Sequence, residues 1–393
     1  MQTRLEHELA EARRQTDELL QTVQHDSLYD RPIPERHRII FYLGHLEAFD
    51  WNLMARYALD SPSFHPSFDR LFAFGIDPEE GGLPADTASE WPRVEEVRRY
   101  NLRTREVIDH SLPNVPEEMV HAAIEHRLMH AETMAYIVHQ LPYDTKAGPE
   151  GQKVMEVLAA ASRQAEAPAP QPRTIEIPDG MAQLGRGREE SFGWDNEYEL
   201  FEEKVSRFAI DRYKVTNGQY LEFVREGGPP PFFWTQRNGE WFYRGMFLEI
   251  PLPLDWPVYV TKCQAEEYAR WQGAALPTEA QFHRAAAGSA PSSNSDFRYW
   301  DPVPVTADDA AGGAPAQMIG NGWEWTSTVF GPFRGFEPRP YYTNYSAPFF
   351  DGAHYVLKGG SPRTAARLLR PSFRNWFRPS YPYIYATFRL VRS

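Results

Sequence analysis

The stretch that decides the fold of the first half is IEHRLMHAETMAYIVHQL, residues 124–141. Its apolar residues recur at three- and four-residue intervals, which predicts an amphipathic helix. His126 and His130 lie four residues apart, so their imidazoles share one face of that helix. A third histidine, His45, lies in an earlier helical stretch, IIFYLGHLEAFDWN, residues 39–52. Neutral imidazole suits iron, copper, nickel or zinc, so the three histidines together predict a transition-metal site.

The helix around this stretch is one of four that we expect in residues 1–160. A proline-containing start marks the second helix, and Ser89 is the expected N-cap of the third. Residues 60–90 are rich in Pro, Gly, Ser and Asp and predict a long loop. Four amphipathic helices joined by one long loop favour a four-helix bundle, whose core is where facing helices build metal sites. The expected helices span residues 2–24, 33–59, 92–112 and 116–141.

A carboxylate often completes an iron site beside two histidines, which raises the question of Glu132. At ~100° per residue, Glu132 lies ~240° around the helix from His126, whereas His130 lies only ~40° away. We therefore expect Glu132 to face away from the ligand pair and His45 to supply the third ligand. Three neutral ligands would leave up to three open positions on an octahedral metal ion.

The character of the chain changes after the segment ASRQAEAPAPQPR, residues 161–173, which predicts a semi-extended linker. We expect a helical domain over residues 1–165, a linker over 166–173 and a second domain over 174–393. The second domain should be α+β, with short strands, irregular loops and two helices, TNGQYLEFVREGG and TKCQAEEYARWQG. Cys263, in the second of these helices, is interpreted as a buried small hydrophobe.

Composition limits the function classes. The net charge of −13, from 41 basic and 54 acidic residues, argues against a nucleic-acid partner. A single cysteine rules out an intrachain disulfide and fits a reducing compartment. The first residues are charged and helical, unlike a signal peptide, and no run of ~18 apolar residues predicts a membrane span. We expect a cytoplasmic protein.

Seven blocks follow one another in the second half. They are IPDGMAQLGRG (177–187), SFGWDNEYE (191–199), DRYKVTNGQYLEFVREGG (211–228), WPVYVTKCQAEEYARWQGAALPTEAQFHRAA (256–286), QMIGNGWEWTSTVFGPFRGF (317–336), YVLKGGSPRTAARLLRPSFRNWF (355–377) and ATFRLV (386–391). In this order they resemble the sulfatase-modifying-factor family, whose founding member is the formylglycine-generating enzyme. The resemblance implies a C-type-lectin-like fold. It also implies that Trp323 and Trp325, which are shared across that family, mark the fold rather than the chemistry.

The first half resembles DinB-like bundles, whose metal motif HRLMHAE matches. The two modules in this order resemble the sulfoxide synthases of ergothioneine biosynthesis and the related synthases of ovothiol and selenoneine. The resemblance implies non-haem iron(II) held by His45, His126 and His130. The reaction it implies joins the sulfur of a thiol donor to the imidazole of hercynine, an N-alpha-trimethylated histidine. Dioxygen is reduced in that reaction, and the sulfur ends as a sulfoxide.

The segment SFRNWF carries the substrate residues that the resemblance implies, Asn375 and Trp376; the alternative is that it is a core strand with a buried tryptophan. Relatives that use γ-glutamylcysteine follow this segment with an Asp and, four residues later, an Arg. Here Phe377 and Tyr381 occupy those places, and Met129 replaces a Gln that precedes the second histidine. An ion-pairing pocket has become aromatic, so we expect these residues to line the site of a less charged donor.

The catalytic residue is not assigned by sequence. A tyrosine that donates a proton in the relatives aligns with Gly313 here. Tyr100, Tyr383 and Tyr385 are candidate replacements, and sequence does not choose among them. Arg374, beside the substrate residues, is at least as easily explained as a structural residue.

Three functions stay open at this stage. The leading one is an iron-dependent synthase that joins hercynine to a thiol donor. The first alternative is a selenoneine-type synthase that joins hercynine to a seleno-sugar, a selenol donor. The second is a non-catalytic binding module. Formylglycine generation is disfavoured because that chemistry uses paired cysteines near the C-terminus, and this chain has one cysteine in all.

Overall fold

The computed structural model describes residues 2–73, 85–147, 168–308 and 313–392. It divides into two compact units, Met1–Pro149 and Glu150–Ser393. The predicted domain boundary at residue 165 lies outside the described residues and stays a prediction. Within these ranges, no helix combines the length and the apolar character needed to cross a membrane.

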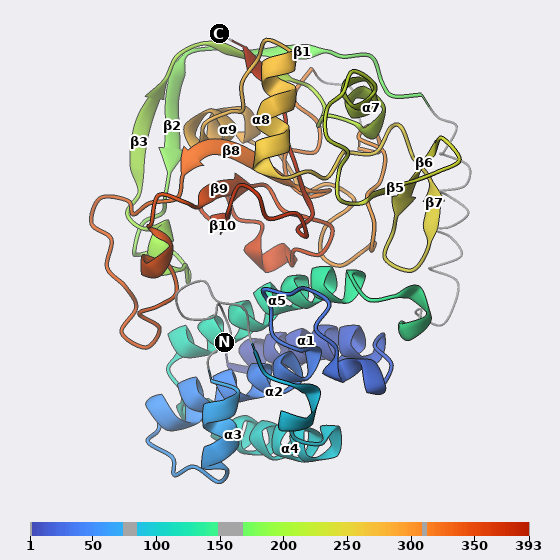
Figure 1. Ribbon diagram of the computed structural model, residues 1–393. Helices are drawn as coiled ribbons and strands as arrows, with labels where there is room; N and C mark the ends of the chain where they lie inside the picture. The colour runs from blue at the N-terminus through green and yellow to red at the C-terminus, as the bar shows by residue number, and fades with distance from the viewer. Residues whose placement is uncertain (1, 74–84, 148–167, 309–312, 393) are drawn as a thin grey trace. The chain divides into compact units, whose positions relative to one another are not determined.

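The first unit is a bundle of four long helices, as the sequence predicted (Figure 1). α1 packs along α5, and α2 packs against both α4 and α5. The long helices are α1 (Gln2–Gln21), α2 (Ile39–Asp50), α4 (Val94–Ser111) and α5 (Glu117–His139). Short 3-10 turns lie between or after them at Asp26–Tyr29, Leu112–Asn114 and Tyr143–Thr145.

The predicted second helix is two pieces. Its α-helical part ends at Asp50, and the chain continues as a seven-residue π-helix, Trp51–Tyr57. Ten of the twelve residues of α2 are buried, so this helix is apolar on nearly all sides and lies inside the bundle. That burial places the α2 histidine in the interior.

Two expectations for the loop after α2 are wrong. Residues 60–90 contain a short helix, α3 (Pro66–Leu71), which begins with proline at its first position after His65. Ser89 is not an N-cap, because it lies inside a 3-10 turn, Ala88–Glu90. Thr87 is the N-cap of this turn, and its hydroxyl donates a hydrogen bond to the Glu90 carboxylate. α4 starts later because a proline separates it from that turn.

In its described residues, 168–308 and 313–392, the second unit is built from four small sheets. Their orders are β1-β4-β12, β10-β9-β8-β11, β2-β3 and β5-β6-β7, with β11 parallel to β8 and the other pairs antiparallel. The strands are β1 (Thr174–Ile177), β2 (Gly180–Leu184), β3 (Phe201–Val205), β4 (Phe208–Asp211), β5 (Trp234–Arg237), β6 (Glu240–Arg244), β7 (Glu249–Pro251), β8 (Trp323–Val329), β9 (Tyr355–Lys358), β10 (Asn375–Phe377), β11 (Ala386–Thr387) and β12 (Val391–Arg392). Short 3-10 turns lie at Asp195–Glu197, Ala347–Phe349 and Ala366–Leu368. Short strands joined by long ordered loops confirm the α+β prediction.

Among the described residues of this unit, three helices accompany the sheets: α7 (Asn217–Arg225), α8 (Lys262–Trp271) and α9 (Glu279–Ala286). Each begins with a threonine N-cap and a glutamine three residues later, the reciprocal arrangement that satisfies the first backbone N–H groups. The sequence predicted α7 and α8 but not α9, although Thr278 and Gln281 carry the same signal. α9 packs against β2 and β8, and its Phe282 joins Phe208, Ile210 and Met318 in the core.

The expectation that Cys263 is buried is wrong. Its side chain is exposed in the first turn of α8. The buried face of this helix is formed by Ala265, Tyr268 and Ala269, and Cys263 lies on another face. Its backbone N–H donates to the carbonyl of Pro379, which fastens the loop after β10 to the start of α8.

Candidate metal centre

Three histidines meet inside the bundle. His45 comes from α2, and His126 and His130 come from one face of α5. The Nε2 atoms of His45 and His130 lie 3.2 Å apart, and one ring nitrogen from each of the three lies within 4.8 Å of the others. Among the described residues, this is the one group of three or more His, Cys, Asp or Glu side chains close enough to share a metal ion.

The tautomer of His45 is set by the backbone. Its Nδ1 lies 2.7 Å from the carbonyl oxygen of Phe72, which can only accept, so Nδ1 carries the hydrogen. Nε2 is then left with its lone pair directed toward His130. A ligand histidine that donates its other N–H to a carbonyl is the usual arrangement at protein metal sites.

All three imidazoles are held neutral. Burial lowers the pKa of His45 to about 4, and burial also places the pKa values of His126 and His130 well below the ordinary value. His45 and His126 are 3% and 2% exposed. A metal ion needs the unprotonated ring, so the lowered pKa values suit ligands.

The spacing of the nitrogens fits one ion. Two nitrogens each ~2.1 Å from one metal are separated by ~3.0 Å at octahedral and ~3.4 Å at tetrahedral angles. The 3.2 Å between the His45 and His130 nitrogens falls between these values. The His45 and His130 nitrogens are therefore spaced as two ligands of one ion, and His126, whose ring nitrogen lies within 4.8 Å of both, can supply a third. The choice of imidazole alone allows iron or zinc.

Aromatic rings hold the histidines in place. Phe41 stacks on His45 with centroids 4.9 Å apart, and Phe49 lies parallel to His126 at 3.4 Å. The Tyr42 ring lies 5.9 Å from that of His130. These supporting rings were not predicted from the sequence, although Phe41 and Phe49 lie four residues before and after His45, the spacing that puts side chains on one helix face.

The structure leaves Glu132 outside the histidine group, as the helix geometry predicted. Met129 lies beside His130 on α5 and is half-buried. Its part in substrate binding stays a prediction.

The tyrosine candidates occupy different surroundings. Tyr100 is buried, and its hydroxyl donates to Asp69 over 2.9 Å; burial and then the Asp69 charge raise its pKa. Tyr385 is buried, with the rings of Phe233 and Tyr259 within 6.0 Å. Tyr383 is half-buried in the second unit. None of the three is singled out as a catalytic residue by its contacts.

The expected substrate residues lie on β10 of the second unit, where Trp376 pairs with Val356 of β9. Trp376 is half-buried and stacks on Phe330, with ring centroids 4.3 Å apart and planes 6° from parallel. Tyr345 and Phe349 approach the same ring at 5.3 Å and 5.6 Å. The Asn375 Oδ1 accepts from the backbone N–H of Trp376. The segment is thus not a fully buried core strand, and its tryptophan is not an isolated side chain on the surface.

Phe377 and Tyr381 form the first part of an aromatic row. Their rings are stacked, with centroids 5.4 Å apart and planes 9° from parallel. Tyr383 meets Tyr381 edge-on at 5.1 Å, and the exposed Phe232 meets Tyr383 at 5.0 Å. The four rings form an aromatic row, Phe377–Tyr381–Tyr383–Phe232. Its first two members, Phe377 and Tyr381, are the positions where the sequence predicted loss of a charge-reading pair.

Arg374 and the tryptophans of GNGWEWT have structural contacts. Arg374 is 2% exposed and forms two hydrogen bonds with the Glu279 carboxylate, at 3.0 Å and 3.2 Å. Trp323 and Trp325 are buried, and the Trp325 indole donates to the Val260 carbonyl. These contacts agree with the interpretation that the tryptophans mark the fold.

Comparison with known proteins identifies the family. The sequence profile of the sulfatase-modifying factor enzyme 1-like domain matches residues 159–312 and 293–393, more than half of the chain. The chain belongs to the sulfatase-modifying factor enzyme 1-like family. In addition to the family domain, the chain has a DinB superfamily domain that matches residues 8–140. The four-helix bundle and the α+β unit are therefore a DinB domain followed by a sulfatase-modifying-factor domain.

Several named proteins are similar in sequence to this chain. Ergothioneine biosynthesis protein 1 of Schizosaccharomyces pombe is 27% identical over 426 residues, which cover 94% of this chain and 53% of the relative. Hercynine oxygenase of Mycolicibacterium thermoresistibile is 37% identical over 246 residues, covering 52% of this chain and 54% of the relative. Hercynine oxygenase of Mycobacterium tuberculosis is 35% identical over 236 residues, covering 50% and 55%. The chain spans about half the length of these curated relatives.

Proposed function

We propose that this protein is an iron(II)- and dioxygen-dependent synthase that forms a carbon–sulfur bond between hercynine and a thiol donor. The observation that carries the proposal is the group of three neutral histidines, whose ring nitrogens converge inside a DinB bundle. The names of the relatives, which refer to ergothioneine biosynthesis and to hercynine, support the substrate. They favour the sulfur reaction over the selenoneine-type alternative.

His45, His126 and His130 would hold the iron, and bound iron(II) would supply the means of bringing dioxygen and a thiolate together. The protein's own residues first orient the three imidazole rings. The Phe72 carbonyl fixes the His45 tautomer, and Phe41 and Phe49 keep the imidazole planes from turning. Burial of the ligands limits the access of water and keeps their nitrogens unprotonated.

The rings around Trp376 suit the cationic end of hercynine. A trimethylammonium group cannot donate a hydrogen bond, so aromatic faces are its best partners, worth about 0.5–2 kcal/mol each. Trp376 is half-buried beside Phe330, Tyr345 and Phe349, which gives such a group several faces in one place. Asn375, next in the strand, offers an amide for the substrate carboxylate.

The test combines oxygen uptake with product analysis. The protein is reconstituted anaerobically with iron(II) and given hercynine with cysteine, γ-glutamylcysteine, glutathione or a seleno-sugar. We expect oxygen consumption that requires both hercynine and a thiol, and a product whose mass is that of a hercynine–thiol sulfoxide. Tight hercynine binding without oxygen uptake for any donor would contradict the proposal and favour a binding module.

A further inference from the structure

A group of buried charges lies beside the histidines in the bundle. Arg127, adjacent to His126 on α5, is fully buried, and so are Glu47 and Asp50 of α2. The Arg127 guanidinium donates to both Glu47 oxygens at 3.0 Å and 2.9 Å and to Asp50 Oδ2 at 2.7 Å. It also donates to the backbone carbonyl of Leu46 at 3.2 Å. One side chain of α5 therefore contacts four acceptor atoms within a single turn of α2.

This turn follows directly after His45. Glu47 lies ~200° around α2 from His45, so the charges and the histidine are on different faces of the helix. α2 is thus held against α5 in two ways, by the histidines and by the Arg127 contacts. Because the four acceptors are spread along the helix axis, sliding α2 along α5 would break several of these hydrogen bonds at once.

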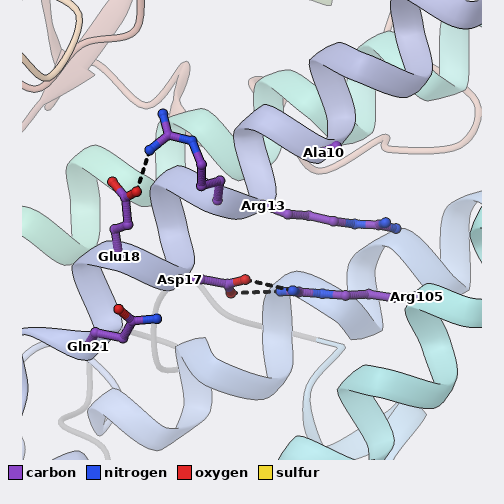
Figure 2. A pocket seen from close by; sticks show the side chains of 7 residues that line it. Ala10, Arg13, Asp17, Glu18, Gln21 and Arg105 are labelled. Carbon is purple, nitrogen blue, oxygen red and sulfur yellow. Dashed lines mark hydrogen bonds and ion pairs between the residues drawn. The ribbon is translucent and has the colours of Figure 1, made fainter.

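The network is anchored to the other helices as well. Arg105 of α4 donates to Glu47 and, through both terminal nitrogens, to Asp17 of α1 at 2.7 Å and 2.8 Å. Figure 2 shows Arg105 meeting Asp17 end-on, with Arg13 of α1 lying alongside. Glu47 is thus held by one arginine from α5 and one from α4, and its position on α2 is fixed from two sides.

Buried ion pairs add little net stability compared with apolar side chains of the same size, because desolvation offsets the attraction. Their best-attested use is to select one register of packed helices. In this bundle the register of α2 against α5 decides how close the His45 nitrogen comes to those of His126 and His130.

We infer that Arg127, with Glu47 and Asp50, is a positioning group for the metal site: it sets the α2–α5 register and thereby the affinity and geometry of metal binding. The inference rests on the proposed function only in requiring that the three histidines bind a metal ion. Removing residues that orient metal ligands lowers affinity by about 10–100-fold, and we expect an effect of that size.

The test uses cobalt(II) as the probe, since imidazole ligands bind it and its visible absorption reports coordination geometry. The main variant is Arg127→Lys, which keeps the charge but loses the planar fork that contacts several acceptors together. The matched control is Arg13→Lys. Arg13 is also a buried bundle arginine, but it pairs with Asp109 and so joins α1 to α4, neither of which carries a histidine of the site.

We expect Arg127→Lys to bind cobalt(II) about 10–100-fold more weakly, with a changed visible spectrum, and Arg13→Lys to match the wild-type protein. If Arg127→Lys does not fold, the neutral variant Arg127→Met with Glu47→Gln and Asp50→Asn takes its place, because it leaves no buried charge unpaired in this trio. If the variant that folds binds cobalt(II) with wild-type affinity and shows the wild-type visible spectrum, the inference about Arg127 is wrong. The proposal of a metal site at the three histidines would be unaffected. No cobalt(II) binding by the wild-type protein would overturn both.

Discussion

Gly44 is the position where a single methyl group should disturb the proposed metal site most directly. It precedes His45 on α2, and a Cβ added there would lie 2.6 Å from three ring atoms of Phe72. Ordinary carbon contacts are ~3.5–4.0 Å, so Gly44→Ala requires a shift of about 1 Å. Phe72 is fully buried, with the rings of Phe68 and Trp91 at 5.4 Å and 6.2 Å, so its ring has little room to move.

The magnitude follows from two opposing terms. Overpacking a filled core costs about 1–3 kcal/mol, whereas glycine to alanine inside a helix gains about 1 kcal/mol from helix propensity. A net loss of up to about 2 kcal/mol in the free energy of unfolding is expected. If the Phe72 backbone moves with its ring, the 2.7 Å hydrogen bond from His45 Nδ1 stretches beyond the useful range, and metal affinity falls by about tenfold.

Urea unfolding and metal titration of Gly44→Ala measure these two effects. Gly331→Ala is the control, since a Cβ added at Gly331 meets no atom within 4 Å. It should leave metal affinity unchanged and should shift stability by no more than about 0.4–1 kcal/mol, which alanine gains through the unfolded chain. A rise in the stability of Gly44→Ala, with metal affinity unchanged, is what helix propensity alone would give. That result would refute the claim that Phe72, packed closely on Gly44, keeps the hydrogen bond of His45 in place.

Three further predictions concern other residues. Glu132→Gln should change metal affinity and turnover by less than about threefold, because helix geometry directs this side chain away from the ligand face; a loss as large as that of a histidine variant would show that it is a ligand. Phe377→Asp combined with Tyr381→Arg should raise the ratio of catalytic efficiencies for γ-glutamylcysteine over cysteine, because an apolar pocket distinguishes two such donors by only ~1–3 kcal/mol per group. A tenfold preference of the wild-type protein for γ-glutamylcysteine would contradict the prediction of a less charged donor. Burial raises the pKa of Asp195 to about 6, above its unfolded value, so its contribution to stability is present at low pH and lost as the pH rises through about 6. Asp195→Asn should therefore gain stability relative to wild type between about pH 4 and pH 7 in urea titrations, and a pH-independent difference would contradict the shift.

The parts of the site that could be predicted from sequence depend on local geometry. The shared face of His126 and His130 and the exclusion of Glu132 follow from the helical repeat alone. The third proposed ligand, His45, depends on which helices pack together, and it was predicted from the resemblance and the expected bundle rather than from spacing. The Phe72 hydrogen bond was not predictable, because its acceptor is a backbone carbonyl at the end of a short helix that the loop-like composition concealed.

Charged residues were the hardest to place. A helical sequence such as LEAFD predicts acidic side chains at the surface, yet Glu47 and Asp50 are buried because Arg127 and Arg105 reach them from neighbouring helices. Such pairing depends on tertiary contacts over many residues. Cys263 shows the reverse error: a small apolar side chain was expected inside, but the face of α8 that carries it is exposed.

The most direct test of the account is the iron(II) content of the protein after anaerobic reconstitution. Wild type should bind one iron(II) per chain, and His130→Ala should lose most of it while its circular dichroism stays unchanged. His139→Ala, a change at another buried histidine of α5 outside the group, should keep full iron content and serve as the control. Full iron occupancy in His130→Ala would contradict the assignment of the three histidines as the metal site.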